Sequence, residues 1–453
     1  MVAVAVLVII LVVAVFAGAH WYVWRRLVRD TTAPRSTVRR LGTAAIWVLP
    51  VLTVGAFTAG RVDAPFWLEQ VLAWPGYLWL PVLLYVILAL LVGEAVRPLL
   101  LRFLARRGPG AFVPGAEAAG SAAPADEAEV AVGAAAGRAG AGAGAAPAPA
   151  APPAPAGPPA ATAPGPDTAP PRADPPAGPS RRLFVSRVVG GAAAAAALGT
   201  VGHGTYGVLR GPRVKRVTVP LAKLPRAAHG YRIAVVSDIH LGPILGRAHT
   251  QRIVDAINAA QPDLVAIVGD MVDGTVENLG PAAEPLTQLR ARHGSFFVTG
   301  NHEYFSGADA WVDHVRELGL RPLRNERVEI AGGFDVAGVD DVAGESFGQG
   351  PDFAAALGDR DRARAAVLLA HQPVVIHDAV EHGVDLQLSG HTHGGQLWPG
   401  NHLAALANPT VAGLEHYGDT QLYVTRGAGA WGPPVRVGAE SDITLVQLAS
   451  RQA

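Results

Sequence analysis

The segment Arg232-Ile-Ala-Val-Val-Ser-Asp-Ile-His240 shows the pattern that decides the fold, a short apolar run that ends in metal-competent polar side chains. The same pattern recurs four times toward the C-terminus. These repeats end in Gly-Asp-Met-Val-Asp at 269–273, Gly-Asn-His-Glu at 300–303, His371, and Gly-His-Thr-His at 390–393. Short apolar runs between turn signals predict buried strands. Because open α/β sheets gather ligand sites at the carboxyl ends of their strands, we expect these polar groups to meet there.

The chain around these motifs reads as a globular α/β domain over 212–453. Ala248–Ala260 is expected to be a helix, with Ile253, Val254 and Ile257 on one face. Strands are expected at the apolar runs 232–237, 264–268, 295–299, 366–370, 384–388 and 443–448. Taken singly, each motif has an ordinary explanation, since Gly-Asp marks turns and Asn-His caps helices. Five such motifs, each at the end of a strand, are hard to obtain by chance.

The types of residue in the motifs limit the chemistry. The chain contains no cysteine, which excludes disulfide scaffolds, zinc fingers and thiol nucleophiles. Asp, His and Asn are the ligands expected for divalent ions such as Mn, Fe, Zn or Ni. Two arginines further on, Arg426 and Arg436, could bind a substrate phosphate or form surface ion pairs, and both alternatives stay open.

The ordered set of motifs resembles the calcineurin-like metallophosphoesterase superfamily. Ser237-Asp-Ile-His-Leu-Gly, Gly300-Asn-His-Glu-Tyr and Gly390-His-Thr-His-Gly-Gly-Gln are most similar to its bacterial membrane-tethered branch. The resemblance spans Asp238 to His393, extends weakly to 215–450, and does not cover 1–210. It implies a four-layer α/β/β/α sandwich that hydrolyses phosphoric esters, with a phosphodiester or pyrophosphate as the expected substrate class.

The same resemblance implies a site with two divalent metal ions and a bridging hydroxide as nucleophile. His302 would lie beside the leaving oxygen, as general acid or as stabiliser of the developing charge, and Asp273 would orient its ring. A purely structural role is the alternative for each. The implied ligands are Asp238, His240 and His393 for one ion, Asn301, His371 and His391 for the other, and Asp270 as the bridge.

Three uncharged runs at 1–24, 41–60 and 70–93 are each long enough to cross a bilayer as a helix, so 1–107 is expected to be a transmembrane region with three helices. The loop after the first run carries six arginines, whereas the loop between the second and third runs has only Arg61. The positive-inside rule then predicts a cytoplasmic first loop and an N-terminus outside.

Residues 108–180 are rich in Ala, Pro and Gly and are expected to form a disordered linker. The segment 181–211 starts with paired arginines and continues as an uncharged run. It resembles a twin-arginine export signal and equally an ordinary fourth span. We expect a multi-pass protein of the cell membrane with its catalytic domain on the extracytoplasmic side.

The chain has 37 basic and 37 acidic side chains, and this balance argues against a nucleic-acid partner. The expected partners are the membrane and a phosphate-ester substrate, with a lipid-linked ester among the candidates. The alternatives are a non-catalytic metal-binding scaffold and a regulatory domain attached to a membrane module. The sequence predicts no oligomeric state.

Overall fold

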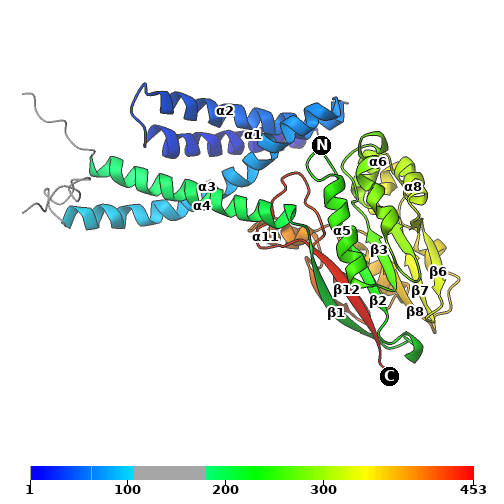
Figure 1. Cartoon of the computed structure of the whole chain (residues 1–453). Helices are drawn as coiled ribbons and strands as arrows, with labels where there is room; N and C mark the ends of the chain where they lie inside the picture. The colour runs from blue at the N-terminus through cyan, green and yellow to red at the C-terminus, as the bar shows by residue number, and fades with distance from the viewer. Residues whose placement is uncertain (1, 63, 107–179, 453) are drawn as a thin grey trace, which may run out of the picture. The chain divides into compact units, whose positions relative to one another are not determined.

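The structure is a computed structural model that describes residues 2–62, 64–106 and 180–452. One compact unit comprises residues 1–100 and 183–453. It contains long helices and two β-sheets (Figure 1). The predicted linker at 108–180 lies outside the described residues, apart from Ser180.

Four helices hold the uncharged runs seen in the sequence, and all four are long and apolar enough to cross a membrane. A π-helical turn at Trp24–Arg29 extends the first, and a 3₁₀ turn at Ala59–Val62 extends the second. The helices are α1 Val2–Val23, α2 Thr37–Thr58, α3 Phe66–Arg106 and α4 Arg181–Leu209.

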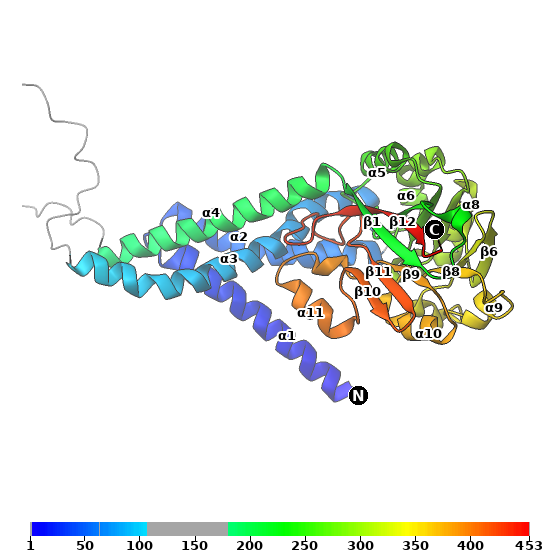
Figure 2. The ribbon, with the colours of Figure 1, turned by 90° about the horizontal axis from the view of Figure 1, so that it is seen from below.

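Polar groups on these helices are paired with each other inside the bundle. The Thr53 hydroxyl on α2 donates a hydrogen bond to the carbonyl of Gly76 on α3, at 2.8 Å. Gly76 permits this approach, because a Cβ there would lie 2.5 Å from the backbone oxygen of Leu52. Arg97 on α3 donates to the Ser186 hydroxyl on α4 at 3.0 Å, where the two helices run side by side (Figure 2).

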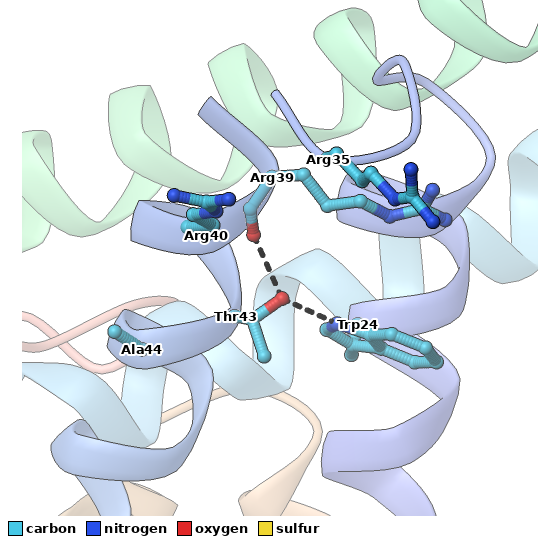
Figure 3. Close-up of a pocket in the computed structure, with 6 residues that line it drawn as sticks. All are labelled: Trp24, Arg35, Arg39, Arg40, Thr43 and Ala44. Carbon is cyan, nitrogen blue, oxygen red and sulfur yellow. Dashed lines mark hydrogen bonds between the residues drawn. The ribbon is translucent and has the colours of Figure 1, made fainter. Parts of the chain in front are cut away.

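The connection between α1 and α2 concentrates positive charge (Figure 3). Arg35, Arg39 and Arg40 line a pocket with Trp24 and Thr43. The Trp24 indole donates to the Thr43 hydroxyl at 2.9 Å, and that hydroxyl donates to the Arg39 carbonyl at 2.7 Å. These bonds fix the end of the first helix against the start of the second, so the arginines are held at one end of the bundle.

The sandwich contains two six-stranded sheets, and the first has the order β1-β12-β2-β3-β4-β5. Neighbouring strands are parallel except where β12 pairs with β2. The strands are β1 Arg213–Leu221, β12 Asp442–Ser450, β2 Arg232–Val236, β3 Leu264–Val268, β4 Ser295–Val298 and β5 Arg321–Pro322.

The second sheet has the order β10-β11-β9-β8-β7-β6. Its four central strands are parallel, and the two edge strands are antiparallel to their neighbours. The strands are β10 Gly413–Tyr417, β11 Thr420–Val424, β9 Leu386–Ser389, β8 Ala365–Leu369, β7 Phe334–Gly338 and β6 Glu326–Ile330.

The main core lies between the two sheets, where Val235 and Val268 of the first pack in one buried cluster with Leu369 and Leu388 of the second. A second cluster joins the first sheet to its outer helices, and a third joins the second sheet to its own. These helices are α5 Arg247–Ala260, α6 Val276–Ala283 and α8 Ala308–Glu317 on the first sheet, and α9 Phe353–Leu357 and α10 Ile376–Glu381 on the second. The predicted four-layer α/β/β/α sandwich is therefore confirmed.

Candidate metal centre

The five motifs follow the carboxyl ends of β2, β3, β4, β8 and β9. Both sheets contribute, so the site lies where the strand ends of the two layers meet. Eight of the nine residues singled out in the sequence lie in three groups, two of which share His240. The ninth, Asn301, directly precedes His302 in the chain.

The first group contains Asp238, His240 and His393, whose ligand atoms lie within 4.8 Å of one another. His393 Nε2 is 3.3 Å from Asp238 Oδ1 and 3.0 Å from His240 Nε2. All three residues are buried. Two ring nitrogens and a carboxylate that face each other in this way form a donor set suited to a divalent cation.

The second group contains Asp270, His371 and His391, again within 4.8 Å. His371 Nε2 lies 3.0 Å from Asp270 Oδ2. The other ring nitrogen of His371, Nδ1, lies 2.9 Å from the carbonyl of Val268, to which it donates. A carbonyl only accepts, so this bond places a proton on Nδ1 and turns Nε2 toward Asp270.

Asp270 stands between the two groups. Its Oδ2 atom is 3.0 Å from His371 Nε2 in the second group and 3.9 Å from His240 Nε2 in the first. Its other oxygen accepts a hydrogen bond from the His302 backbone at 2.9 Å, which fixes the carboxylate plane. One carboxylate oxygen therefore faces both donor sets.

Unpaired polar atoms show that these residues fit metal ions. Asn301, the first residue of α7 (Asn301–Ser306), has a buried Oδ1 with no hydrogen-bond partner among the described residues. The same holds for His371 Nε2, whose 3.0 Å approach to Asp270 lacks hydrogen-bond geometry, and for His391 Nδ1. Burying such atoms without a partner is costly. Coordination to a cation would satisfy all three.

A third group joins His240 to His302 through Asp273. Asp273 Oδ1 accepts from His240 Nδ1 at 2.8 Å and from His302 Nδ1 at 2.7 Å. Because an ionised carboxylate only accepts, both rings donate through Nδ1. These two bonds account for the third group without an ion, and they turn His240 Nε2 toward the first group.

The buried charges of the site shift its pKa values. Burial raises the pKa of the Asp238, Asp270 and Asp273 carboxyls, but the facing histidines outweigh it and hold each well below its usual range. Burial lowers the pKa of His391 and of His393 to about 4. Burial also lowers the pKa of His371, but the charge of Asp270 outweighs burial and raises it well above its usual range. Metal binding requires ionised carboxylates and neutral imidazoles, so a cation at His371 would displace a proton.

The pKa of His302 is shifted in the opposite direction from those of the two histidines in the Gly-His-Thr-His motif. Burial lowers its pKa, but the hydrogen bond to Asp273 and the charge of that carboxylate outweigh burial and raise the pKa to about 9. The ring is therefore cationic at neutral pH and can give up a proton.

The backbone at the site is strained. Five of the seven predicted ligands lie in the left-handed region, with φ of 51° for Asp238, 49° for His240, 51° for Asp270, 71° for His391 and 52° for His393. A non-glycine residue at positive φ is uncommon, and such residues cluster at functional sites. The surrounding fold therefore holds these side chains in positions that an unstrained chain would not adopt.

Sequence reasoning missed Glu303, which organises the backbone of the site. Its buried carboxylate accepts from the backbone N–H groups of Asp270 at 2.9 Å, Met271 at 2.7 Å and Gly300 at 2.6 Å. Burial and the charge of Asp270 raise the pKa of Glu303 to about 7. Its position three residues after Gly300 matches the Glu of a capping box, and this signal could have found it.

Arg436 is placed differently from both alternatives given by the sequence. Its guanidinium is buried and donates to the His393 carbonyl at 3.0 Å and to His393 Nδ1 at 2.9 Å. It also donates to the carbonyls of Gly429 and Ala439. Arg436 therefore neither forms a surface ion pair nor points to a substrate phosphate, and instead donates hydrogen bonds to one of the predicted ligands.

The fold and the Asp and His groups at its strand ends are those of a metal-binding α/β/β/α sandwich, and the comparisons with known proteins identify it as a metal-dependent phosphoesterase domain. A family model described as calcineurin-like phosphoesterase matches residues 231–395. A Danio rerio transmembrane protein with metallophosphoesterase domain is 39% identical over 259 residues, which is 54% of this chain and 59% of the relative.

Bacterial relatives are matched over more of their length. An uncharacterized metallophosphoesterase of Helicobacter pylori is 38% identical over 273 residues, 60% of this chain and 73% of the relative. One of Aquifex aeolicus is 35% identical over 243 residues, 53% of this chain and 92% of the relative. The chain belongs to the calcineurin-like phosphoesterase family.

The chain spans less than two thirds of the Danio rerio relative, whose printed name includes the word transmembrane. Together with the four apolar helices, this relationship makes the chain a membrane-associated protein with a metallophosphoesterase domain.

Proposed function

We propose that the sandwich domain hydrolyses a phosphodiester or a pyrophosphate at a centre of two divalent ions, chosen among Mn, Fe, Zn and Ni. The observation that carries the proposal is the position of Asp270, one oxygen of which faces both His240 and His371. A carboxylate shared by two cations holds them close enough to act on one phosphoryl group. When bound, the ions supply charge stabilisation and a water of lowered pKa.

Side chains of the protein position the reacting groups, donate the proton and bind the ions in the proposed hydrolysis. In the proposed assignment Asp273 is the positioning residue, because it holds the rings of His240 and His302 through one oxygen. With Nδ1 of His302 bonded to Asp273, Nε2 is the nitrogen that donates a proton to the leaving oxygen. The proposed ligands are Asp238, His240 and His393 for one ion, Asn301, His371 and His391 for the other, and Asp270 for both.

Substitution of the bridge tests the proposal. We expect Asp270→Asn and His391→Ala each to lower the hydrolysis of bis(4-nitrophenyl) phosphate by about a hundredfold or more, because each removes a ligand. The matched controls are Asp313→Asn, whose side chain is 74% exposed, and His416→Ala on an edge strand. Undiminished hydrolysis in both ligand variants would contradict the metal mechanism. A wild-type protein that binds metal but does not hydrolyse the phosphodiester would instead favour the non-catalytic scaffold.

We also propose that the protein is multi-pass and that the sandwich lies on the extracytoplasmic side. The arginine-rich connection between α1 and α2 supports a cytoplasmic position for that loop (Figure 3). The connection between α2 and α3, with Arg61, lines a cavity together with sandwich residues, so it shares the side of the sandwich.

Because the chain has no cysteine, single cysteines report the orientation directly. In intact spheroplasts a membrane-impermeant maleimide should label an Asp313→Cys variant and leave an Ala33→Cys variant unlabelled until the cells are opened. The reverse pattern would place the sandwich in the cytoplasm.

A lipid-linked substrate fits a catalytic domain held against membrane helices. The Tyr85 hydroxyl on α3 donates to the carbonyl of Trp398 in the sandwich at 2.9 Å. Such contacts keep the metal centre near the bilayer, where esters of lipid alcohols are concentrated.

A further inference from the structure

A cavity of about 420 Å³ lies between the membrane helices and the candidate metal centre. One wall comes from the end of α2, the connection to α3 and the start of α3. The opposite wall comes from the segment after β3, from α7 and from the loop at 431–432. The lining includes Phe57, Arg61, Tyr77, His302, Phe305 and Trp431.

Aromatic side chains line this cavity beside His302. The Trp431 ring lies 6.2 Å from Phe57 of α2 and 5.8 Å from His302, and the Phe305 ring lies 5.6 Å from His302. Phe305 is 71% exposed and Trp431 is 48% exposed. Large exposed aromatic side chains that gather beside a polar site indicate a binding surface for an apolar group.

The cavity also contains polar groups at the membrane side. Arg61 bonds to the backbone carbonyl of Phe57, and the Tyr77 hydroxyl donates to the carbonyl of Ala56 at 3.1 Å. Glu69 and Glu277 add carboxylates to the lining. The lining therefore suits an amphiphile, with apolar rings for a hydrocarbon chain and charged groups for the polar region next to it.

The position of the cavity tells which part of a substrate it would hold. Of the site residues, His302 and Asp273 line it, whereas the seven proposed ligands are not among the described residues that do. His302 is the proposed proton donor to the leaving oxygen. The cavity therefore lies on the side of the leaving group.

We propose that this cavity binds the hydrocarbon chain of a membrane-derived phosphate ester in the position of the leaving alcohol. The inference rests on the proposed hydrolysis. In the step, the oxygen of water forms the new bond to phosphorus while the bond from phosphorus to the lipid alcohol breaks. The alcohol oxygen keeps that electron pair and takes a proton from His302. The products are a lipid alcohol and a phosphate monoester.

A homologous series of alkyl phosphates tests the cavity in the full-length protein. The probes are ethyl, butyl, hexyl and octyl phosphate, used as competitive inhibitors of bis(4-nitrophenyl) phosphate hydrolysis below their micellar concentrations. Full burial of one methylene improves binding by about fourfold. We expect the inhibition constant to fall about two- to fourfold for each methylene added.

Variants of the cavity lining test whether the dependence of the inhibition constant on chain length arises in this cavity. Phe305→Ala, Trp431→Ala and Phe57→Ala should each flatten the dependence on chain length, because each removes apolar wall. Leu406→Ser on α11 (Gly400–Ala407), where Leu406 is 85% exposed outside the cavity, is the matched control and should keep the wild-type slope. Metal content and thermal unfolding confirm that the compared variants are folded.

An inhibition constant that does not change with chain length in the wild type would overturn the inference. So would an unchanged slope in all three cavity variants. Absence of bis(4-nitrophenyl) phosphate hydrolysis in the wild type would instead contradict the proposed function itself, so the two failures are distinguishable.

Discussion

At the scale of single residues, Asp273 links the proposed metal ligands to the proposed proton donor. One oxygen accepts from both His240 and His302. Loss of its charge weakens the acceptor that both rings share. Asp273 is therefore the position where a change outside the ligand set should affect the chemistry most.

We predict that Asp273→Asn lowers kcat for bis(4-nitrophenyl) phosphate by about ten- to a hundredfold, the usual effect of removing a partner of a metal ligand. KM should change less, because Asp273 acts through the two histidines. Steady-state kinetics on the purified protein measures the split, with Asp313→Asn as the control. A variant in which KM rises and kcat is unchanged would contradict this role.

His249 on α5 gives a prediction about pH. It is 1% exposed, and neither ring nitrogen has a hydrogen-bond partner among the described residues. Burial, and then the charges of Arg252 and Arg436, lower its pKa to about 3. The folded state therefore holds it neutral, whereas the unfolded chain takes up a proton near pH 6.5. Stability from this residue is present above pH 6.5 and is lost as the pH falls toward 3.

Replacing His249 with leucine should remove this loss of stability at low pH. When the pH is lowered from 8 to 5, we expect the free energy of unfolding of the wild type to fall by about 2 kcal/mol more than that of His249→Leu. Thermal unfolding at both pH values checks the difference. Parallel pH dependence in the two proteins would show that His249 is not held neutral.

Motifs in the sequence predicted the positions of the proposed ligands because each motif follows its strand directly. Glu303 and Arg436 were harder to find. Glu303 acts through backbone N–H groups, which leave no mark in the sequence beyond the capping spacing. The partner of Arg436, His393, lies 43 residues away, so the contact exists only after the loops have packed.

At the scale of elements, apolar runs predicted β2, β3, β4, β8 and β9 to within about two residues, and the helical face at 248–260 became α5. Edge strands escaped prediction because their faces are mixed. β1 and β10 carry charged side chains and are largely exposed or half-buried. The order of strands was also beyond the sequence, since β12 inserts between β1 and β2 from the far end of the chain.

The central place of β12 gives a prediction about truncation. Ending the chain after Glu440 removes a strand that pairs with β1 on one side and β2 on the other. It also removes the buried side chains of Ile443, Val446 and Leu448 from two core clusters. We expect this truncated protein not to accumulate in a folded, protease-resistant form.

Ending the chain after Arg451 is the matched control and should leave protease resistance unchanged, since β12 remains whole. Recovery of a resistant sandwich from the shorter chain would show that β12 is dispensable. The comparison is made by limited proteolysis of membrane preparations.

At the scale of the molecule, the neutral net charge hides two unlike parts. Residues 1–211 contain 17 basic and 10 acidic side chains, and 212–453 contain 20 basic and 27 acidic. The boundary falls where α4 ends and β1 begins. Composition alone predicted this division into membrane helices and an acidic α/β domain, but it gave no sign of the cavity that both parts line.

We propose that seven residues from two sheets hold two ions through one shared carboxylate. The most direct test is the metal content of the purified full-length protein, measured by elemental analysis together with its phosphodiesterase activity. We predict two divalent ions per chain in the wild type and at most one in His391→Ala and in His240→Ala, with activity lost in both. An active wild-type protein with one ion or none per chain would contradict the account.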